Sequence, residues 1–257
     1  MATKVYDGYI VTQVGTLRLY CGSGQSPQAL LQAIKGGGEI IKTSRKSETR
    51  RVGEWVVKRS RLENGLGPIK RTLARGRYRR AWVAANYLRD HGVCVPEPLA
   101  YGEWTLSRLV LGNVMVTRFL SGHVNVEVYA AGLEKQAGAQ DALDGFFAGL
   151  ASAVNGLSAA GAYHADLSGK NIFTKDGNEF YFIDLDGVVL RKRYSDGLRL
   201  KNHVQLYDSF CDFCRYDMLA RFIGRMLPEG SHSNAWLQAV ELGQKIRRRQ
   251  HQGRQQS

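Results

Sequence analysis

A short polar motif in the second half of the chain constrains its fold more than any other feature. His164, Asp166 and Leu167 stand in the pattern H-x-D-L, and Asn171 follows five positions after the aspartate. The apolar run FYFI then ends at Asp184, eighteen positions after Asp166. The pair H-x-D is common by itself, but the complete set in this order and spacing is not. It is typical of a loop after a helix, followed by a strand that carries a second carboxylate.

These residue types suit one kind of chemistry. Kinase-type phosphoryl transfer needs a carboxylate to accept the proton of the attacking hydroxyl, and an amide oxygen with a second carboxylate to hold Mg²⁺ against the phosphates of ATP. Asp166 is the predicted base, and Asn171 and Asp184 are the predicted metal ligands. Lys170 is a candidate to contact the transferred phosphoryl group, with a solvent-facing lysine as the alternative. His164 is expected to pack and hydrogen-bond in the loop.

Asp186 leaves the metal site open to two interpretations. If the strand continues through Asp184-Leu185-Asp186, alternation places both carboxylates on the same face. Asp186 is then a second metal ligand or the partner of a basic residue.

The first half of the chain contains a candidate phosphate lysine. Lys58 ends the run WVV, which resembles the strand that carries the phosphate-binding lysine of kinases. A surface lysine is the alternative. The polar stretch Ser44–Arg50 is expected to be a loop between strands at 39–43 and 51–58. Its backbone amides and the Ser44 hydroxyl are candidate phosphate ligands, and a plain hairpin loop explains the stretch equally well.

The helix predicted at 75–91 departs from the kinase pattern, because it contains no glutamate to pair with Lys58. Glu63 or Glu97 replaces that glutamate, or the pair is absent. A non-catalytic pseudokinase that acts as a binding module therefore remains an alternative.

The order of the expected elements predicts an α+β, two-lobed, protein-kinase-like fold with a β-rich N-lobe and a small α-helical C-lobe. The expected parts are an N-terminal extension (1–38), the N-lobe (39–120), the C-lobe (121–244) and a basic, disordered tail (245–257).

The charge of the chain predicts anionic partners. The net charge is +13, with 14 Lys/Arg and three acidic residues between positions 42 and 80, and five more basic residues between 245 and 254. Such fields attract nucleotides, nucleic acid, anionic lipid headgroups or acidic glycolipids. The sequence has no apolar run near the ~20 residues that span a bilayer and no signal-peptide pattern, so we expect a cytoplasmic protein. Cys211 and Cys214 form an isolated C-x-x-C, which we interpret as two ordinary helix cysteines.

The segments HADLSGKNI, FYFIDLDG and RGRYRRAWVAANYLRDHGVCVPEPLAYGE resemble those of the lipopolysaccharide core kinases, the Kdo kinase and heptose kinase family. The resemblance runs from about residue 40 to 225. It implies ATP- and Mg²⁺-dependent phosphorylation of a sugar hydroxyl on the lipid A–core glycolipid, by a peripheral protein at the cytoplasmic face of the inner membrane. It also implies that Asp166 is the base, that Lys58 binds phosphates, and that Thr117 and Phe119 lie in the hinge near adenine.

The end of the chain favours the same class of acceptor. Only 71 residues follow Asp186, and they contain no Ala-Pro-Glu, whereas protein kinases use this region to bind peptides. The alternatives are a small atypical protein kinase of the RIO type, which would also bind RNA, and an aminoglycoside- or choline-type kinase, which usually has an acidic acceptor pocket. Nucleic acid is the less favoured partner.

Overall fold

The computed structural model describes residues 2–6, 9–22, 24–44, 47–60, 76–107, 109–136, 138–191, 194–228 and 230–255. The chain divides into two compact units, each described separately below. The first unit comprises Met1–Tyr87 and Pro96–Ser121, and the second comprises Leu88–Val95 and Gly122–Ser257. Among the described residues, no helix has the length and apolar character needed to cross a membrane.

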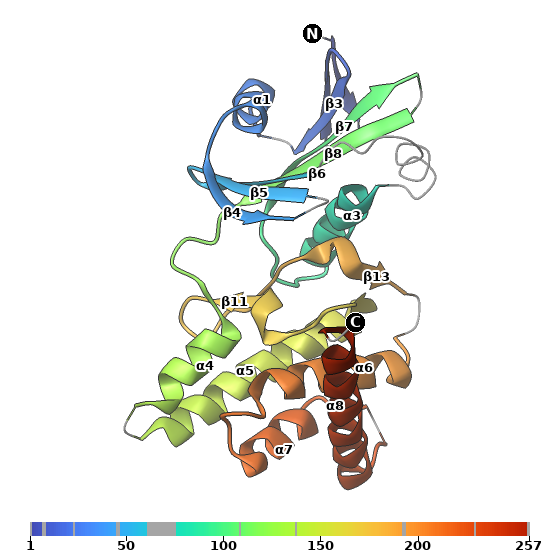
Figure 1. Cartoon of the computed structure of the whole chain (residues 1–257). Helices are drawn as coiled ribbons and strands as arrows, with labels where there is room; N and C mark the ends of the chain where they lie inside the picture. The colour runs from blue at the N-terminus through green and yellow to red at the C-terminus, as the bar shows by residue number, and fades with distance from the viewer. Residues whose placement is uncertain are drawn as a thin grey trace. The chain divides into compact units, whose positions relative to one another are not determined.

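The first unit is built on an eight-stranded sheet with the order β1-β2-β3-β7-β8-β6-β5-β4 (Figure 1). Every neighbouring pair in the sheet is antiparallel. Its strands are β1 (Ala2–Tyr6), β2 (Tyr9–Val14), β3 (Leu17–Gly22), β4 (Glu39–Thr43), β5 (Ser47–Val52), β6 (Trp55–Ser60), β7 (Pro98–Leu106) and β8 (Leu109–Arg118). Two helices accompany them, α1 (Pro27–Lys35) and α3 (Arg77–Asp90), of which the part up to Tyr87 belongs to this unit.

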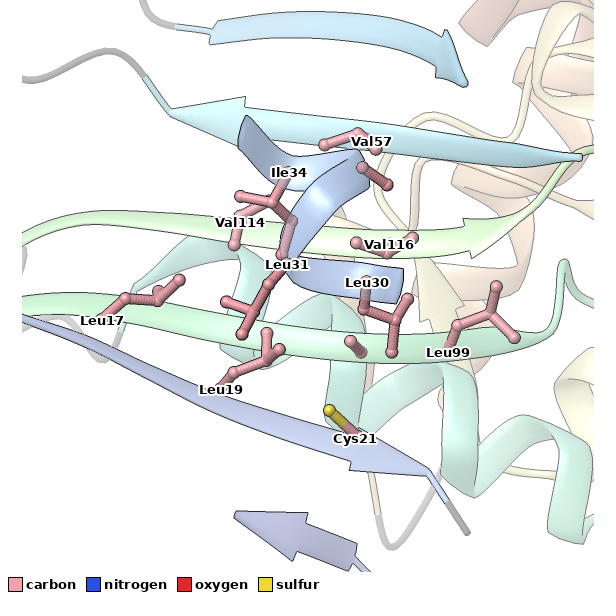
Figure 2. Packing of buried hydrophobic residues seen from close by; sticks show 12 residues of the cluster. Leu17, Leu19, Cys21, Leu30, Leu31, Ile34, Val57, Leu99, Val114 and Val116 are labelled. Atoms are coloured by element: carbon pink, nitrogen blue, oxygen red, sulfur yellow. The ribbon is translucent and has the colours of Figure 1, made fainter. Parts of the chain in front are cut away.

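The core of this unit lies between the sheet and α1 (Figure 2). The apolar positions of β3 alternate inward, and Leu30, Leu31 and Ile34 form the buried face of α1. Ser26 caps the helix by accepting a hydrogen bond from the Ala29 N–H, which satisfies a donor at the helix N-terminus that has no partner within the helix. Burial of leucine and isoleucine side chains contributes about 1.5–3 kcal/mol each, so α1 is an integral part of the unit.

The prediction of a separate N-terminal extension at 1–38 is therefore wrong. Residues 2–6, 9–14 and 17–22 form three strands of the sheet, and β3 pairs with β7 from Leu17 to Cys21. This pairing joins segments about eighty residues apart in the sequence, which local patterns do not predict.

The second unit is mostly helical. Its helices are α4 (Val126–Glu134), α5 (Ala139–Ala159), α6 (Asp196–Phe210), α7 (Tyr216–Gly224) and α8 (Ser233–Gln255). Its short strands are β9 (Val124–Asn125), β10 (Ala162–His164), β11 (Ile172–Thr174), β12 (Tyr181–Phe182) and β13 (Val188–Leu190), and its 3₁₀ turns are η1 (Gly169–Asn171) and η2 (Leu185–Gly187). The Phe147 ring of α5 lies against the rings of Phe146, Phe210 and Phe222. These buried aromatic contacts join α5 to α6 and α7.

The expectation of a disordered tail from residue 245 is also wrong, because α8 continues to Gln255. Arg248 of this helix binds Asp208 and Asp212. These ion pairs attach the helix to the unit.

Candidate active site

The H-x-D-L motif begins at the last residue of β10 in the second unit and continues into the loop that follows this strand. β10 pairs with β13 in antiparallel register, His164 opposite Val188. The Ala165 N–H donates to the Gly187 carbonyl at 3.3 Å. The ladder therefore brings the segment around Asp166 next to the segment that contains Asp184.

His164 connects these two segments through its ring. The ring is buried, with Nε2 at 2.9 Å from the Ile183 carbonyl and Nδ1 accepting the Asp166 N–H at 3.2 Å. Donation from Nε2 and acceptance at Nδ1 require the neutral ring. Burial lowers the pKa of His164, while the bond to Ile183 and the nearby Asp184, Asp166 and Asp186 carboxylates oppose this shift. His164 thus orders the loop, the structural role predicted for it.

Asp166 and Asn171 are in direct contact. The Asn171 amide donates to the Asp166 carbonyl at 2.9 Å and to Asp166 Oδ2 at 3.0 Å. The Asp166 side chain is 59% exposed, so its carboxylate is accessible to a substrate. Since the Asn171 nitrogen faces Asp166, its amide oxygen is directed elsewhere and suits a metal ligand. Lys170 is exposed in η1 between them.

The prediction that a strand carries Asp184 and Asp186 on one face is wrong. β12 ends at Phe182, the Ile183 N–H donates to the Asn171 carbonyl at 2.9 Å, and Asp184 has a left-handed φ of 59°. Aspartate is one of the few residues that adopt this conformation at low cost. Asp186 follows inside η2. The two side chains therefore do not follow strand alternation, although both carboxylates lie near the His164 ring.

Three polar side chains of α6, whose role we did not predict, form hydrogen bonds to backbone groups of the catalytic loop. The Gln205 amide donates to the Ala165 carbonyl at 2.7 Å and accepts the Leu167 N–H at 2.9 Å. Asn202 donates to the His164 carbonyl at 2.6 Å, and the Ser209 hydroxyl accepts the Gly169 N–H at 2.8 Å. The signal in the sequence was a polar stripe at the helical spacing 202, 205 and 209.

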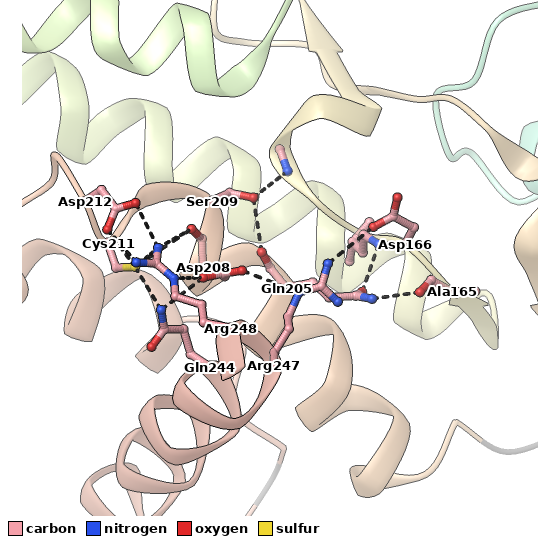
Figure 3. Close-up of polar contacts among 12 residues, drawn as sticks. Ala165, Asp166, Gln205, Asp208, Ser209, Cys211, Asp212, Gln244, Arg247 and Arg248 are labelled. Atoms are coloured by element: carbon pink, nitrogen blue, oxygen red, sulfur yellow. Dashed lines mark hydrogen bonds and ion pairs between the residues drawn. The ribbon is translucent and has the colours of Figure 1, made fainter. Parts of the chain in front are cut away.

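The C-terminal helix also reaches the loop. Arg247 of α8 lies 3.8 Å from Asp166 Oδ1 and 3.4 Å from Asp208 Oδ2 (Figure 3). We did not predict this contact, since Arg247 is 81 positions from Asp166 and stands among other basic residues.

In the first unit, Lys58 and Thr117 share one face of the sheet. Lys58 pairs with Met115 and Val56 with Thr117, whereas the intervening pair, Val57 and Val116, faces the core under α1. Side chains alternate along strands, so Lys58 and Thr117 lie on the face opposite α1.

Ser44 and Phe119 have local structural roles. The expected loop at 44–50 is mostly strand, because β5 begins at Ser47 and pairs with both β4 and β6. Ser44 lies in the turn before it, where its hydroxyl accepts the Ser47 N–H at 3.0 Å. The Phe119 N–H donates to the Glu54 carbonyl at 2.8 Å, and the Arg51 guanidinium lies 4.0 Å from the centre of its ring.

One proposed partner of Lys58 has a different contact. The Glu97 carboxylate accepts bonds from Arg118 Nε at 3.1 Å and Nη2 at 2.9 Å. Glu63 lies outside the described residues.

Cys211 and Cys214 are free thiols, and burial raises the pKa of Cys214 to about 12. Among the residues that the structure describes, no cluster of three or more His, Cys, Asp or Glu side chains could hold a metal ion.

Comparison with known proteins identifies the family. The model of the lipopolysaccharide kinase (Kdo/WaaP) family matches residues 42–225. The chain belongs to this family. As a member of the Kdo/WaaP family it is a kinase, and its acceptor is a sugar hydroxyl. This assignment sets aside the small atypical protein kinase as an alternative.

Solved structures show the same fold at low sequence identity. A structure of WaaP in complex with acyl carrier protein is 20% identical with a TM-score of 0.65, over 87% of this chain and 93% of that chain. A crystal structure of WbdD is 17% identical with a TM-score of 0.51, over 79% of this chain and 45% of that chain. No curated protein matches the chain. The predicted α+β, kinase-like fold is confirmed.

The polar groups of the loop fit a magnesium ion bound together with a nucleotide. Mg²⁺ prefers oxygen ligands and usually takes one or two carboxylates, with phosphates and water completing its shell. Asn171 offers an amide oxygen, and Asp184 and Asp186 offer carboxylates near the same ring. A site of this type needs no cluster of three acidic side chains.

Proposed function

We propose that this protein transfers the γ-phosphoryl group of ATP to a hydroxyl of Kdo or heptose in the lipopolysaccharide inner core, with Asp166 as the base. The observation that carries the proposal is the exposed Asp166 carboxylate, fixed through Oδ2 by Asn171 and through its backbone by His164. Family membership supports the sugar acceptor.

In the proposed reaction, the acceptor hydroxyl donates its proton to Asp166 as its oxygen forms a bond to the γ-phosphorus. The bond between that phosphorus and the β–γ bridging oxygen breaks, and ADP leaves with the electron pair. Asn171 and Asp184 would hold Mg²⁺, with Asp186 as a second carboxylate ligand, and the ion when bound neutralises charge on the phosphates. Lys170 would contact the transferred group.

Lys58, Thr117 and Phe119 are proposed to bind ATP from the first unit. Lys58 would contact the phosphates, and the segment from Thr117 to Phe119 would contact adenine. The shared sheet face of Lys58 and Thr117 supports this assignment. Ser44 is a weaker candidate, because its hydroxyl already stabilises the turn before β5.

We also propose that the protein binds peripherally to the cytoplasmic face of the inner membrane. An exposed face of α8 combines Leu242 and Ile246 with Lys245 and Arg249. Such a face suits the boundary between anionic headgroups and acyl chains. We call these four residues the outer face of α8.

The proposal is tested by incubating the protein with Mg²⁺, γ-labelled ATP and dephosphorylated core glycolipid. We expect label in the glycolipid with the wild type. Asp166→Asn should lower kcat by at least about 100-fold, because general-base catalysis contributes about 10²–10⁴-fold. Asp141→Asn, which removes the same charge at an exposed position of α5, is the control and should retain full activity.

Two acceptors identify the sugar. Label in a glycolipid that ends at Kdo would assign Kdo, and label only in a heptose-extended glycolipid would assign heptose. Absence of label in both, with ATP consumed or the protein itself labelled, would contradict the proposed function.

A further inference from the structure

Three consecutive arginines of α8 have different surroundings. Arg247 lies 3.8 Å from Asp166 Oδ1 and 3.4 Å from Asp208 Oδ2, Arg248 binds Asp208 and Asp212, and Arg249 is exposed. Successive residues of a helix are rotated by about 100°, so a single side of α8 reaches the catalytic loop. Figure 3 shows Arg247 and Arg248 diverging from the helix toward these two sites.

Arg248 is sufficient to attach this end of α8. Its Nε lies 2.6 Å from Asp208 Oδ1, and its Nη1 and Nη2 lie 2.9 and 2.8 Å from the Asp212 carboxylate. Gln244 adds a bond to Asp208 at 3.0 Å, and the N–H of the half-buried Trp236 donates to His203 at 2.9 Å. The helix therefore has its own anchors, and the approach of Arg247 to Asp166 is not needed to attach it.

The contact between Arg247 and Asp166 is long for a salt-bridge hydrogen bond. Nη2 lies 3.8 Å from Asp166 Oδ1, beyond hydrogen-bond distance, and the Arg247 side chain is 29% exposed. A guanidinium carries five N–H donors in a planar fork that matches a carboxylate or a phosphate. Arg247 therefore lies beside Asp166 without forming a hydrogen-bonded ion pair with it.

The two carboxylate oxygens of Asp166 have different neighbours. Oδ2 accepts the Asn171 amide, which leaves Oδ1 to receive the proton of the acceptor. A hydroxyl that approaches Oδ1 must lie next to the Arg247 guanidinium. The N–H donors of this guanidinium are therefore placed to bind an anionic group on the same acceptor.

We propose that Arg247 belongs to the acceptor site, where its guanidinium binds an anionic group of the sugar acceptor, a carboxylate or a phosphate, next to the hydroxyl that Asp166 deprotonates. This proposal rests on the proposed function and makes α8 a determinant of acceptor specificity.

The test measures steady-state kinetics with a water-soluble, deacylated core oligosaccharide, so that membrane binding has no influence. Arg247→Met should raise the KM for the oligosaccharide by about 10- to 100-fold, the loss expected for a charge-assisted bond, and leave the KM for ATP within about twofold. Arg247→Lys should give an intermediate value, because lysine keeps the charge but not the fork.

Two control variants distinguish a loss of acceptor binding from a loss of stability and from the loss of one positive charge. Arg215→Met removes one exposed arginine from the N-terminus of α7 and should leave both KM values unchanged. Arg248→Met should lower Tm more than Arg247→Met does, because Arg248 forms three contacts of 2.6, 2.9 and 2.8 Å with Asp208 and Asp212, whereas Arg247 lies 3.4 Å from Asp208.

Two modified acceptors identify the anionic group. If Arg247 binds a carboxylate, reduction of the sugar carboxyl should raise the acceptor KM of the wild type and leave that of Arg247→Met unchanged. If Arg247 binds a phosphate, enzymatic removal of the phosphate should have these two effects instead. The proposal is wrong if Arg247→Met leaves the acceptor KM unchanged, if it raises both KM values equally, or if neither modification affects the wild type. By contrast, a wild type that neither binds the oligosaccharide in calorimetry nor phosphorylates it would overturn the proposed function first.

Discussion

At the scale of single residues, two buried histidines of the second unit depend on staying neutral. His164 orders the catalytic loop, and His203 accepts the Trp236 N–H on Nδ1. Burial lowers the pKa of His164, and burial together with the nearby Arg199 lowers the pKa of His203 to about 3. In the unfolded chain both rings would titrate near pH 6.5.

This difference makes stability depend on pH. Below about pH 6.5 the unfolded state binds protons that the folded state does not, so the free energy of unfolding should fall as the pH decreases toward the folded pKa values. The slope is at most about 1.4 kcal/mol per pH unit for each histidine. Urea denaturation between pH 7 and 4.5, followed by tryptophan fluorescence, measures it.

His203→Asn is the informative variant, because its amide oxygen can still accept the Trp236 N–H but does not titrate. Its slope should be smaller than that of the wild type by about 1 kcal/mol per pH unit. His232→Asn, at an exposed position, is the control. If His203→Asn kept the full wild-type slope, His203 would not be the buried neutral ring described here.

At the scale of elements, α6 acts as the support of the catalytic loop. Its polar residues Gln205 and Ser209 form bonds to backbone groups of the loop at Ala165, Leu167 and Gly169. A buried backbone group that loses its partner costs about 1–3 kcal/mol. The helix therefore stabilises the loop through specific bonds as well as through apolar packing.

Replacing Gln205 tests this support. Gln205→Met keeps the size of the side chain but leaves the Ala165 carbonyl and the Leu167 N–H without partners. We expect the free energy of unfolding to fall by about 2–4 kcal/mol and kcat to fall, since Asp166 follows directly after Ala165. Urea midpoints and kcat are the measurements.

Lys201→Met, on the exposed side of the same helix, provides the control and should change stability by less than about 0.5 kcal/mol. Equal stabilities of the two variants would show that the loop does not depend on α6.

At the scale of the whole molecule, the basic residues of α8 fall into two groups, one in ion pairs and one exposed. Arg247 and Arg248 turn toward acidic side chains of the same unit, while Lys245 and Arg249 are exposed. Removing residues 245–257 would therefore damage both the unit and any membrane contact. Substitutions on the outer face of α8 give a cleaner test of membrane binding.

Leu242→Ser combined with Ile246→Ser should weaken binding to vesicles that contain anionic phospholipid, because both side chains are exposed apolar groups, 60% and 46% accessible. Cosedimentation at low and at high salt measures the effect, and wild-type binding should decrease with salt because surface charges are screened. Val128→Ser on α4, 56% exposed, is the matched control. Binding that is independent of salt and of these substitutions would contradict the membrane proposal.

The chemistry of the site was predictable because it depends on residue types at short spacings. Asp166 and Asn171 are five positions apart and meet directly. The helix at 75–91 and the apolar helix before the motif were predicted for the same reason, since each follows its own hydrophobic period. The polar segment at 44–50 was not recognised as a strand, because every residue of β5 is half-buried and the strand therefore lacks that period.

Other features depend on contacts that the order of residues does not encode locally. The pairing of β3 with β7, the left-handed turn at Asp184, the stripe on α6 and the approach of Arg247 to Asp166 each become apparent only when distant segments are packed together. The reason is physical: a motif specifies which groups are present, whereas burial and long-range pairing decide which atoms face them. The family and the reaction type were thus contained in the sequence, and the surroundings of Asp166 were decided by the tertiary structure.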